Sequence, residues 1–409
     1  MTISLWSQRV HLAPSLVLLF TIGCAVEEGG ASQEEPDGQA PGQGGEGGSS
    51  SPGDNGGNAG GGNTGFHDAG PGGSTPPLQN ERADASLGGM GGAVAGPASA
   101  GIRKDICGTK AWVFTTEGIG RPELVAQSGD VNGNKHAFTF LEGPVWRAAD
   151  ATLLFSDFNT ASALNSDKMG PPSLIWQLGT DGVVKPAFAE GSVRANGMAI
   201  DDAGNILVAD HGVRGISRIA KDGKRATVTD NFENKAFNAP NDLATTSDGS
   251  VYFTDPTYNG QVDGRETPIG YEGVYRVAPD GQVQLIDRTL KRPNGITVSL
   301  DEKWLYVSSK DESTIYRYPL TSGAVGPKQP FITGQPTDGV TLDCAGNLYL
   351  AVPGKALRVF DPQGKQIWET LSRKPITNVA FGGPQHNVLY VTEQTGLHRI
   401  QMVTPGLPY

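Results

Sequence analysis

Oxygen-bearing side chains recur at the start of similar segments along this 409-residue chain. Glu142 interrupts the otherwise apolar stretch FLEGPVW (140–146), and related segments open on asparagine or aspartate at intervals of about 40 to 54 residues. The opening residues are Glu142, Asn196, Asn241, Asn294, Asp338 and Asn378. Carboxylates and amide oxygens without Cys or His form a ligand set that suits Ca²⁺ or Mg²⁺ and suits zinc poorly.

Two of these residues, Glu142 and Asp338, carry a negative charge. If they converge in a narrow channel without a cation, they repel each other and one of them takes up a proton. A divalent cation would neutralise both, and Asn294 and Asn241 could each add a carbonyl oxygen. The sequence therefore predicts a divalent metal site with positions left open for water and substrate.

Turn formation is the alternative role for several of these residues. Asn-Gly pairs, present at Asn196 and Asn294, are typical of hairpin turns. Pro293 precedes Asn294 where a hairpin would need a strand, so we expect Asn294 to be a ligand. For Asn196 we expect a structural or substrate-facing role.

The same alternative applies to Asn241-Asp242, which follow Pro240, and to the Asp338-Gly339 pair. We expect site roles for both pairs. For Asp338 the reason is that it opens a strand in register with the Glu142 segment. Asn378 is expected to be structural. His211, in VADHGVRG, could edge the cleft and contact substrate, although a surface or hydrogen-bonded histidine is the default interpretation.

The segments that must position these side chains share one pattern. Each has a short alternating strand, a polar turn such as 202–205 or 247–250, and a second apolar strand, which together predict a β-hairpin. A third strand follows most copies. Such a repeat predicts an all-β, six-bladed β-propeller whose first strands line a central channel. The apolar stretch AWVFTTEG, from Ala111, could supply a strand that closes the last blade.

The N-terminal quarter has a different composition. Residues 1–24 contain Arg9, an apolar stretch and Cys24 after a small residue, which predicts an export signal of the lipoprotein type. Lipidation of Cys24 is the preferred interpretation, with plain cleavage or an uncleaved anchor as alternatives. Residues 25–104 are rich in Gly, Pro and Ser and predict a disordered linker. Residues 105–409 are assigned to the propeller.

Charge and cysteine content limit the partners and the compartment. The net charge of −11 and the absence of a basic stripe argue against nucleic-acid binding. Cys107 and Cys344 form an even pair in an exported chain, so a disulfide is expected, with two buried thiols as the alternative. We expect a cell-envelope lipoprotein, in the outer membrane or periplasm, or a secreted protein, with membrane contact only through the lipid. The sequence does not decide the oligomeric state.

Residues 140–400 resemble the senescence-marker-protein/gluconolactonase family, which includes regucalcin, with diisopropyl fluorophosphatase as a more distant relative. The resemblance rests on six motifs taken together, since any one of them alone would be weak evidence. The motifs are EGPVW at Glu142, ANGMAIDDAGNILVADHG at Ala195, NAPNDLATTSDGSVYFTDPTY at Asn238, RPNGITVSLDEKWLYVS at Arg292, TDGVTLDCAGNLYLA at Thr337 and NVAFGGPQHNVLYVT at Asn378.

The resemblance implies one divalent metal, usually calcium, with Mg²⁺, Mn²⁺ or Zn²⁺ as other possibilities. It implies that Glu142, Asn294 and Asp338 are metal ligands and that Asn241 binds metal or substrate. The implied activity is hydrolysis of a small sugar lactone, a carboxylic ester hydrolase reaction, with Asp338 orienting or deprotonating water and Asp242 as the alternative base. The alternative functions are those of another lactonase, a phosphotriesterase, or a non-catalytic propeller that binds a partner and uses metal for rigidity.

Overall fold

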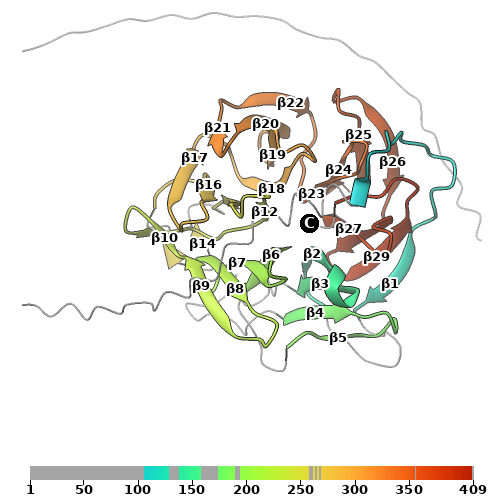
Figure 1. The fold of residues 1–409 in the computed structure, drawn as a ribbon, viewed down its shortest axis with the longest axis horizontal. Coiled ribbons are helices and arrows are strands. Elements are labelled where there is room, and N and C mark those ends of the chain that lie inside the picture. Colours follow the sequence, from blue (N-terminus) through green and yellow to red (C-terminus); the bar gives the residue numbers. More distant parts are fainter. Residues whose placement is uncertain are drawn as a thin grey trace, which may run out of the picture. The chain divides into compact units, whose positions relative to one another are not determined.

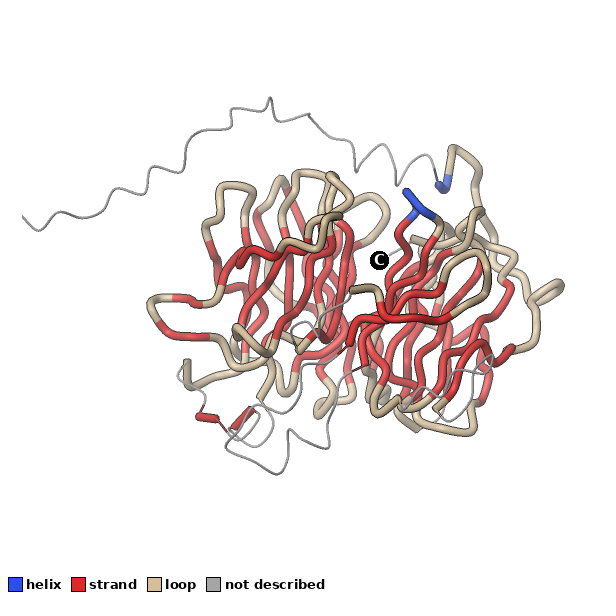
Figure 2. Tube along the Cα trace, turned by 90° about the horizontal axis from the view of Figure 1, so that it is seen from below, coloured by secondary structure: helices blue, strands red, loops and turns tan. Residues whose placement is uncertain are grey.

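The described part of the chain contains six antiparallel sheets of four or five strands, arranged around a central axis (Figure 1). The computed structural model describes residues 106–128, 138–157, 174–188, 194–257, 261–262, 265–266, 269–354 and 356–407. The strands run between two faces formed by loops and turns, as Figure 2 shows. The predicted six-bladed propeller is therefore confirmed.

Each sheet is one blade, and its first strand is the innermost. Blade 1 contains β2 (Leu141–Arg147), β3 (Thr152–Asp157), β4 (Leu174–Leu178) and β5 (Val184–Pro186). Blade 2 contains β6 (Ala195–Ile200), β7 (Ile206–Asp210), β8 (Gly215–Ile219) and β9 (Arg225–Thr229). Blade 3 contains β12 (Leu243–Thr245), β13 (Val251–Asp255), β16 (Gly273–Val277) and β17 (Val283–Asp287).

The second half of the ring has the same order. Blade 4 contains β18 (Pro293–Val298), β19 (Trp304–Ser309), β20 (Thr314–Thr321), β22 (Gln329–Thr333) and the short β21 (Ala324–Val325). Blade 5 contains β23 (Val340–Leu342), β24 (Leu348–Val352), β25 (Ala356–Phe360) and β26 (Gln366–Leu371). Blade 6 contains β27 (Ile376–Gly382), β28 (Val388–Glu393), β29 (Gly396–Gln401) and β1 (Glu123–Gln127).

Three short elements complete the described structure. They are the 3₁₀ turn η1 (Ala148–Asp150), the hairpin of β10 (Asn231–Phe232) and β11 (Lys235–Ala236), and the pair β14 (Gln261–Val262) and β15 (Arg265–Glu266).

Six apolar clusters, one between each pair of neighbouring blades, make up most of the core. Alternation along a strand sends successive side chains to opposite faces. In β13, Phe253 therefore packs toward blade 2 while Tyr252 packs toward blade 4. The cluster between blades 6 and 1 includes the stacked rings of Trp146 and Tyr390, 6.2 Å apart. The blades are thus held chiefly by face-to-face burial.

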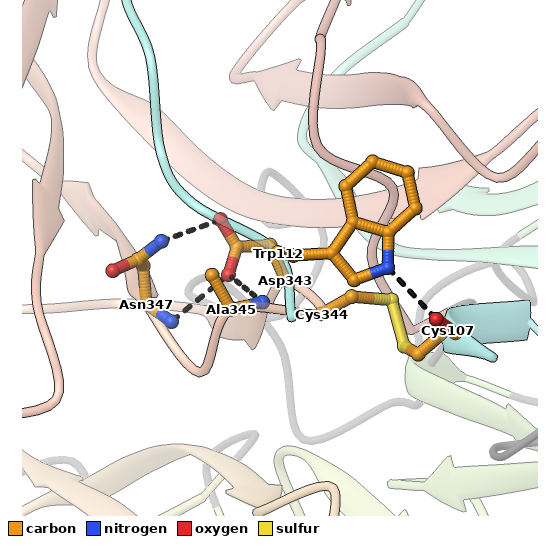
Figure 3. The surroundings of a disulfide bond; sticks show 6 residues. All are labelled: Cys107, Trp112, Asp343, Cys344, Ala345 and Asn347. Carbon is orange, nitrogen blue, oxygen red and sulfur yellow. Dashed lines mark hydrogen bonds between the residues drawn. A yellow bond between two sulfur atoms is a disulfide. The ribbon is translucent and has the colours of Figure 1, made fainter. Parts of the chain in front are cut away.

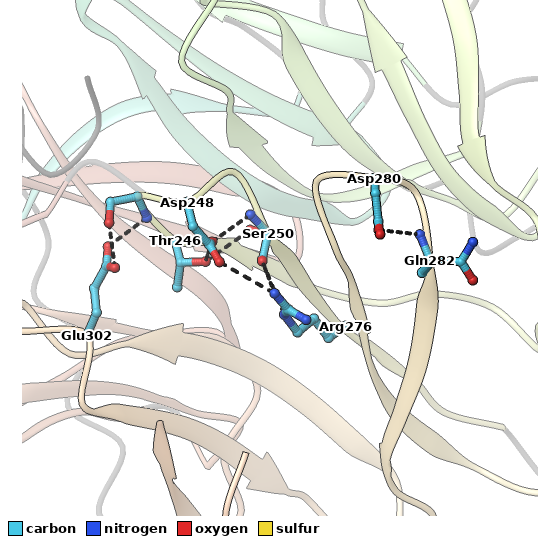
Figure 4. Close-up of polar contacts among 8 residues, drawn as sticks. Thr246, Asp248, Ser250, Arg276, Asp280, Gln282 and Glu302 are labelled. Carbon is cyan, nitrogen blue, oxygen red and sulfur yellow. Dashed lines mark hydrogen bonds and ion pairs between the residues drawn. The ribbon is translucent and has the colours of Figure 1, made fainter. Parts of the chain in front are cut away.

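Polar turns add contacts between blades. The predicted turn at 247–250 is present, and Asp248 accepts hydrogen bonds from the Thr246 hydroxyl and the Ser250 N–H (Figure 4). Glu302, in the corresponding turn of blade 4, accepts from the Ser247 N–H at 2.8 Å and its hydroxyl at 2.7 Å. These turns fix the spacing of blades 3 and 4.

The ring closes through a strand from the N-terminal side. β1 pairs antiparallel with β29, from Glu123 opposite Arg399 to Gln127 opposite Gly396. The prediction that an early segment closes the last blade is confirmed, but the choice of residues 111–118 is wrong. That stretch forms no strand, and Val113 is 77% exposed. Its apolar character reflects instead the packing of Trp112 beside the disulfide.

A disulfide joins Cys107 to Cys344, as expected, with Cα atoms 5.3 Å apart (Figure 3). The Trp112 indole N–H donates to the Cys107 carbonyl at 2.8 Å, and both residues pack with Leu407. The Cys344 N–H donates to the Pro405 carbonyl. The turn of blade 5 therefore anchors segments from both ends of the propeller.

The predicted export signal (1–24), Cys24 and the linker (25–104) lie outside the described residues. Within the residues that are described, no helix combines the length and the apolar character needed to cross a bilayer.

Candidate active site at the centre of the ring

The predicted site residues lie on or just before the innermost strands. These strands contact one another in a closed order, β2 with β6, β6 with β12, β12 with β18, β18 with β23, β23 with β27 and β27 with β2 (Figure 1). All the residues concerned are at most 7% exposed; they are Glu142, Asn196, Asn241, Asp242, Asn294, Asp338 and Asn378. Residues far apart in the sequence therefore meet around one axis.

A β-bulge occurs where these side chains enter the ring. The pairing of β18 with β19 shifts register between Pro293 and Ile296, so Asn294 and Gly295 stand outside the regular ladder. In blade 3, the N–H of Asn241 donates to the Thr254 carbonyl, and the N–H of Thr254 donates to the Asp242 carbonyl, so two residues oppose one. Bulges re-aim side chains and are frequent beside active sites. The local backbone thus turns these side chains away from the blade faces.

Hydroxyl groups fix the backbone of the site residues from the neighbouring blade. Thr254 Oγ1 of blade 3 donates to the Asn294 carbonyl at 2.7 Å, and Ser308 Oγ of blade 4 donates to the Asp338 carbonyl at 3.3 Å. Ser156 Oγ of blade 1 likewise donates to the Asn196 carbonyl at 2.9 Å. These three positions are therefore held by the second strand of the preceding blade.

Glycine follows several site residues because the adjacent blade passes very close. A Cβ on Gly295 would lie 2.3 Å from the Asp338 carbonyl oxygen, and the Gly295 N–H donates to that oxygen at 3.0 Å. A Cβ on Gly339 would lie 2.0 Å from Asn378 Oδ1. These two positions leave no space for a side chain, so the Asn-Gly and Asp-Gly pairs serve packing around the channel.

Glu142 is a buried acid among other acids. Burial raises its pKa well above the usual range, and the charges of Asp338 and Asp242 raise it further, whereas Lys310 and the Asn378 amide oppose the shift. Asn378 Nδ2 donates to Glu142 Oε2 at 3.3 Å. The prediction that Asn378 is only structural is incomplete, because its amide contacts the acidic cluster directly.

Asp242 belongs to the same cluster. Burial raises its pKa to about 7, and Asp338 adds to this, although hydrogen bonds from the backbone of Leu243 and Ile296 and from Asn378 act in the opposite direction. A carboxyl group with a pKa near neutrality is suited to accept and return a proton.

Lys310 was not predicted from the sequence, yet its Nζ lies 2.8 Å from Asp338 Oδ2. It follows the last residue of the second strand in its repeat, as His211 does in blade 2. The backbone confirms the equivalence: the His211 N–H donates to the Arg194 carbonyl and the Lys310 N–H donates to the Arg292 carbonyl. Comparing the residue after each second strand would have identified it.

The remaining predicted residues have distinct surroundings. Asn196 Oδ1 is buried and has no hydrogen-bond partner among the described residues. His211 is 2% exposed, which excludes a surface position and leaves the hydrogen-bonded histidine of the default interpretation. Its contact with substrate, and that of Asn196 and Asn241, remain predictions.

The donor set fits a hard divalent cation only if amide oxygens take part. Within the described ranges, no three Asp, Glu, His or Cys side chains form a metal-binding group by themselves. The carboxylates of Glu142 and Asp338 are close enough to raise the pKa of Glu142, and amides surround them. The unpartnered oxygen of Asn196 shows that the ring retains donor capacity. Such oxygen-rich, partly anionic surroundings suit Ca²⁺ or Mg²⁺.

A cavity of about 540 Å³ lies between blades 5 and 6, and none of these acids lines it. Ser372, Glu393 and His398 line it, but the Ser372 hydroxyl donates to Glu393 and not to the imidazole. His398 Nε2 also contacts Glu393, at 3.2 Å. Since the carboxylate lies between the hydroxyl and the imidazole, the serine contacts no imidazole in this group, which therefore does not form a Ser-His-acid triad.

Comparisons with known proteins agree on one family. Residues 140–395 match the SMP-30/gluconolactonase/LRE-like region. The chain is 33% identical to a gluconolactonase from Zymomonas mobilis over 298 residues, which cover 65% of this chain and 79% of that protein. A pentonolactonase from Haloferax volcanii is 30% identical over 131 residues, covering 30% of this chain and 45% of that protein.

Two solved structures have a similar fold. A gluconolactonase from Xanthomonas campestris superposes with a TM-score of 0.60 at 26% identity, covering 70% of this chain and 90% of that one. A calcium-binding regucalcin from Agrobacterium tumefaciens has a TM-score of 0.55, covering 70% of this chain and 98% of that one. Its identity of 19% supports the fold alone.

Proposed function

Because the chain belongs to the SMP-30/gluconolactonase/LRE-like family, we propose that it is a hydrolase that opens the ring of a sugar lactone. The observation that carries the proposal is the cluster of Glu142, Asp242 and Asp338 at the centre of the ring, on or just before the innermost strands and within the family motifs. The lactonase activities named for the Zymomonas and Haloferax relatives support the substrate class.

A divalent cation, Ca²⁺ first, would be held by Glu142, Asn294 and Asp338, with Asn241 as a further ligand or a substrate contact. When bound, it would supply Lewis-acid polarisation of the lactone carbonyl. The fit is supported by the donor set and by the electrostatics, since ionised acids in one buried cluster require a compensating positive charge.

The protein's own acids would handle the protons. In the reaction, a water oxygen bonds to the lactone carbonyl carbon, its proton passes to a carboxylate, and the ring C–O bond breaks. The carboxylate then returns the proton to the departing hydroxyl, and a hydroxy acid results. Asp338 is one candidate for this carboxylate and Asp242 is the other. The pKa of about 7 favours Asp242 as the base.

A lactone panel on metal-stripped protein tests the proposal. We expect turnover of glucono- or pentonolactones to depend on adding back Ca²⁺, Mg²⁺, Mn²⁺ or Zn²⁺ separately. No turnover of any lactone, with cleavage of an organophosphate triester, would indicate a phosphotriesterase. Metal-dependent thermal stability without turnover of either class would indicate a non-catalytic binding module.

Glu142→Gln should lower kcat/KM by about 100-fold or more while the propeller remains folded, because it removes a charged site group. Glu393→Gln is the matched control, since Glu393 is similarly buried, at 6% exposed, but lines the cavity between blades 5 and 6. Comparable losses in both variants would contradict a site role for Glu142.

We also propose export and lipidation at Cys24, which the disulfide supports because disulfides persist in oxidising compartments. Cys24→Ala should move the protein from the membrane fraction to the soluble fraction of the envelope. An unchanged distribution would contradict the lipid anchor without affecting the proposed activity.

A further inference from the structure

Lys310 places a positive charge inside the acidic cluster. Its Nζ is 2.8 Å from Asp338 Oδ2, and its side chain is 25% exposed while that of Asp338 is 8% exposed. Its charge also reaches Glu142. The ammonium therefore contacts one of the two carboxylates that the proposed function assigns to the metal and acts electrostatically on the other.

The ammonium and a divalent cation cannot both use the same carboxylate oxygens at close range, because like charges repel more strongly in a buried site. Lysine is a compact point charge on a flexible stem and can withdraw toward solvent without breaking the fold. The partial exposure of Lys310 gives it a path to do so.

We propose that Lys310 is a built-in counter-cation that occupies Asp338 when no metal is bound and competes with the metal for it. This inference rests on the proposed function, because it concerns the metal of the same site. Two consequences follow. Lys310 stabilises the metal-free propeller by neutralising the buried acids, and it weakens the apparent metal affinity.

Both consequences can be measured without turnover. Ca²⁺ is titrated into metal-stripped wild type and Lys310→Met by calorimetry, and thermal unfolding is followed without metal. Methionine keeps the length of the stem and removes the charge. We expect the metal-free variant to unfold at a lower temperature and to bind Ca²⁺ at least about 10-fold more tightly, since the net charge of the ligand group sets affinity.

Two further variants, Lys310→Arg and Lys303→Met, are the controls. Arginine keeps the charge, so its Ca²⁺ affinity should stay within a few-fold of wild type. Lys303, in the same blade, pairs with Asp301 at the surface, and its side chain is 73% exposed, so its loss should change neither quantity. Weaker or unchanged Ca²⁺ binding by Lys310→Met would overturn the competition.

The outcomes separate this inference from the proposed function. Lactone turnover with unchanged Ca²⁺ affinity in Lys310→Met would refute the counter-cation role and leave the hydrolase proposal standing. Tighter Ca²⁺ binding in Lys310→Met without lactone turnover by wild type would support the role of Lys310 and refute the activity. Absence of Ca²⁺ binding to wild type and variant alike would overturn the competition.

Discussion

At the scale of single residues, the central cluster combines three acids with one ammonium and several amides. Asn378 bridges to Glu142 across 236 positions of sequence, and Lys310 pairs with Asp338 across 28. Glu142 and Asp338 were predictable because each opens a repeat, Asp242 because it follows the opening residue Asn241, and equivalent repeat positions converge in a closed ring. Lys310 and the bridging role of Asn378 were not predicted, because they depend on how neighbouring blades face each other.

The raised pKa of Asp242 leads to a pH-dependent stability in metal-free protein. The folded-state pKa is about 7, above the ordinary value of 3.8, so the folded state holds a proton that the unfolded chain releases. This contribution is fully present below about pH 4 and is lost as the pH rises through about 7. Urea denaturation of metal-free protein across that range should show stability falling with pH.

Asp242→Asn should flatten this fall, because its side chain does not ionise. A variant with the wild-type slope would show that other groups, Glu142 first among them, set the pH dependence. Asp181→Asn, at an exposed turn, is the control and should keep the wild-type slope.

At the scale of elements, bulges and inter-blade hydrogen bonds convert ordinary strands into a site. Sequence alternation and polar turns predicted the hairpins and their order correctly. The same signals did not reveal β1, because ELVAQ is short and mostly exposed, with the burial of Ala126 as its main apolar contribution. Its pairing with β29 depends on ring closure, which no local pattern encodes.

The close approach at Gly295 is testable. Gly295→Ala should lower the free energy of unfolding by about 1–3 kcal/mol, because a methyl group would overlap the Asp338 backbone. It should also lower kcat by displacing Asp338. Gly354→Ala is the control, since its Cβ would meet only Val352 Cγ1 at 3.9 Å. Equal effects of the two substitutions in urea denaturation would show that the contact at Gly295 relaxes freely.

At the scale of the whole molecule, β1 and the disulfide both close the structure, but at different places. β1 completes blade 6, whereas Cys107–Cys344 fastens the segment before it to the turn of blade 5. The cysteines are 237 positions apart, so the bond restricts a long loop in the unfolded chain.

Cys107→Ser combined with Cys344→Ser should therefore lower the free energy of unfolding by about 2–5 kcal/mol. Turnover at room temperature should remain near wild type, because neither cysteine lies on an innermost strand. Chemical denaturation with a parallel lactone assay measures both. A stability equal to that of wild type would mean that blade packing alone keeps the N-terminal segment in place.

The position of this bond also decides where a mechanical load would act. Cys107 has a covalent link into blade 5, whereas β1 begins 16 residues later, at Glu123. A force applied to the chain before Cys107 would act first on the Cys107–Cys344 bond and on the turn between β23 and β24 that contains Cys344. Only afterwards would it act on the hydrogen bonds of β1. The pairing of β1 with β29 would therefore not carry a force applied before Cys107 as long as the disulfide and the turn of blade 5 hold.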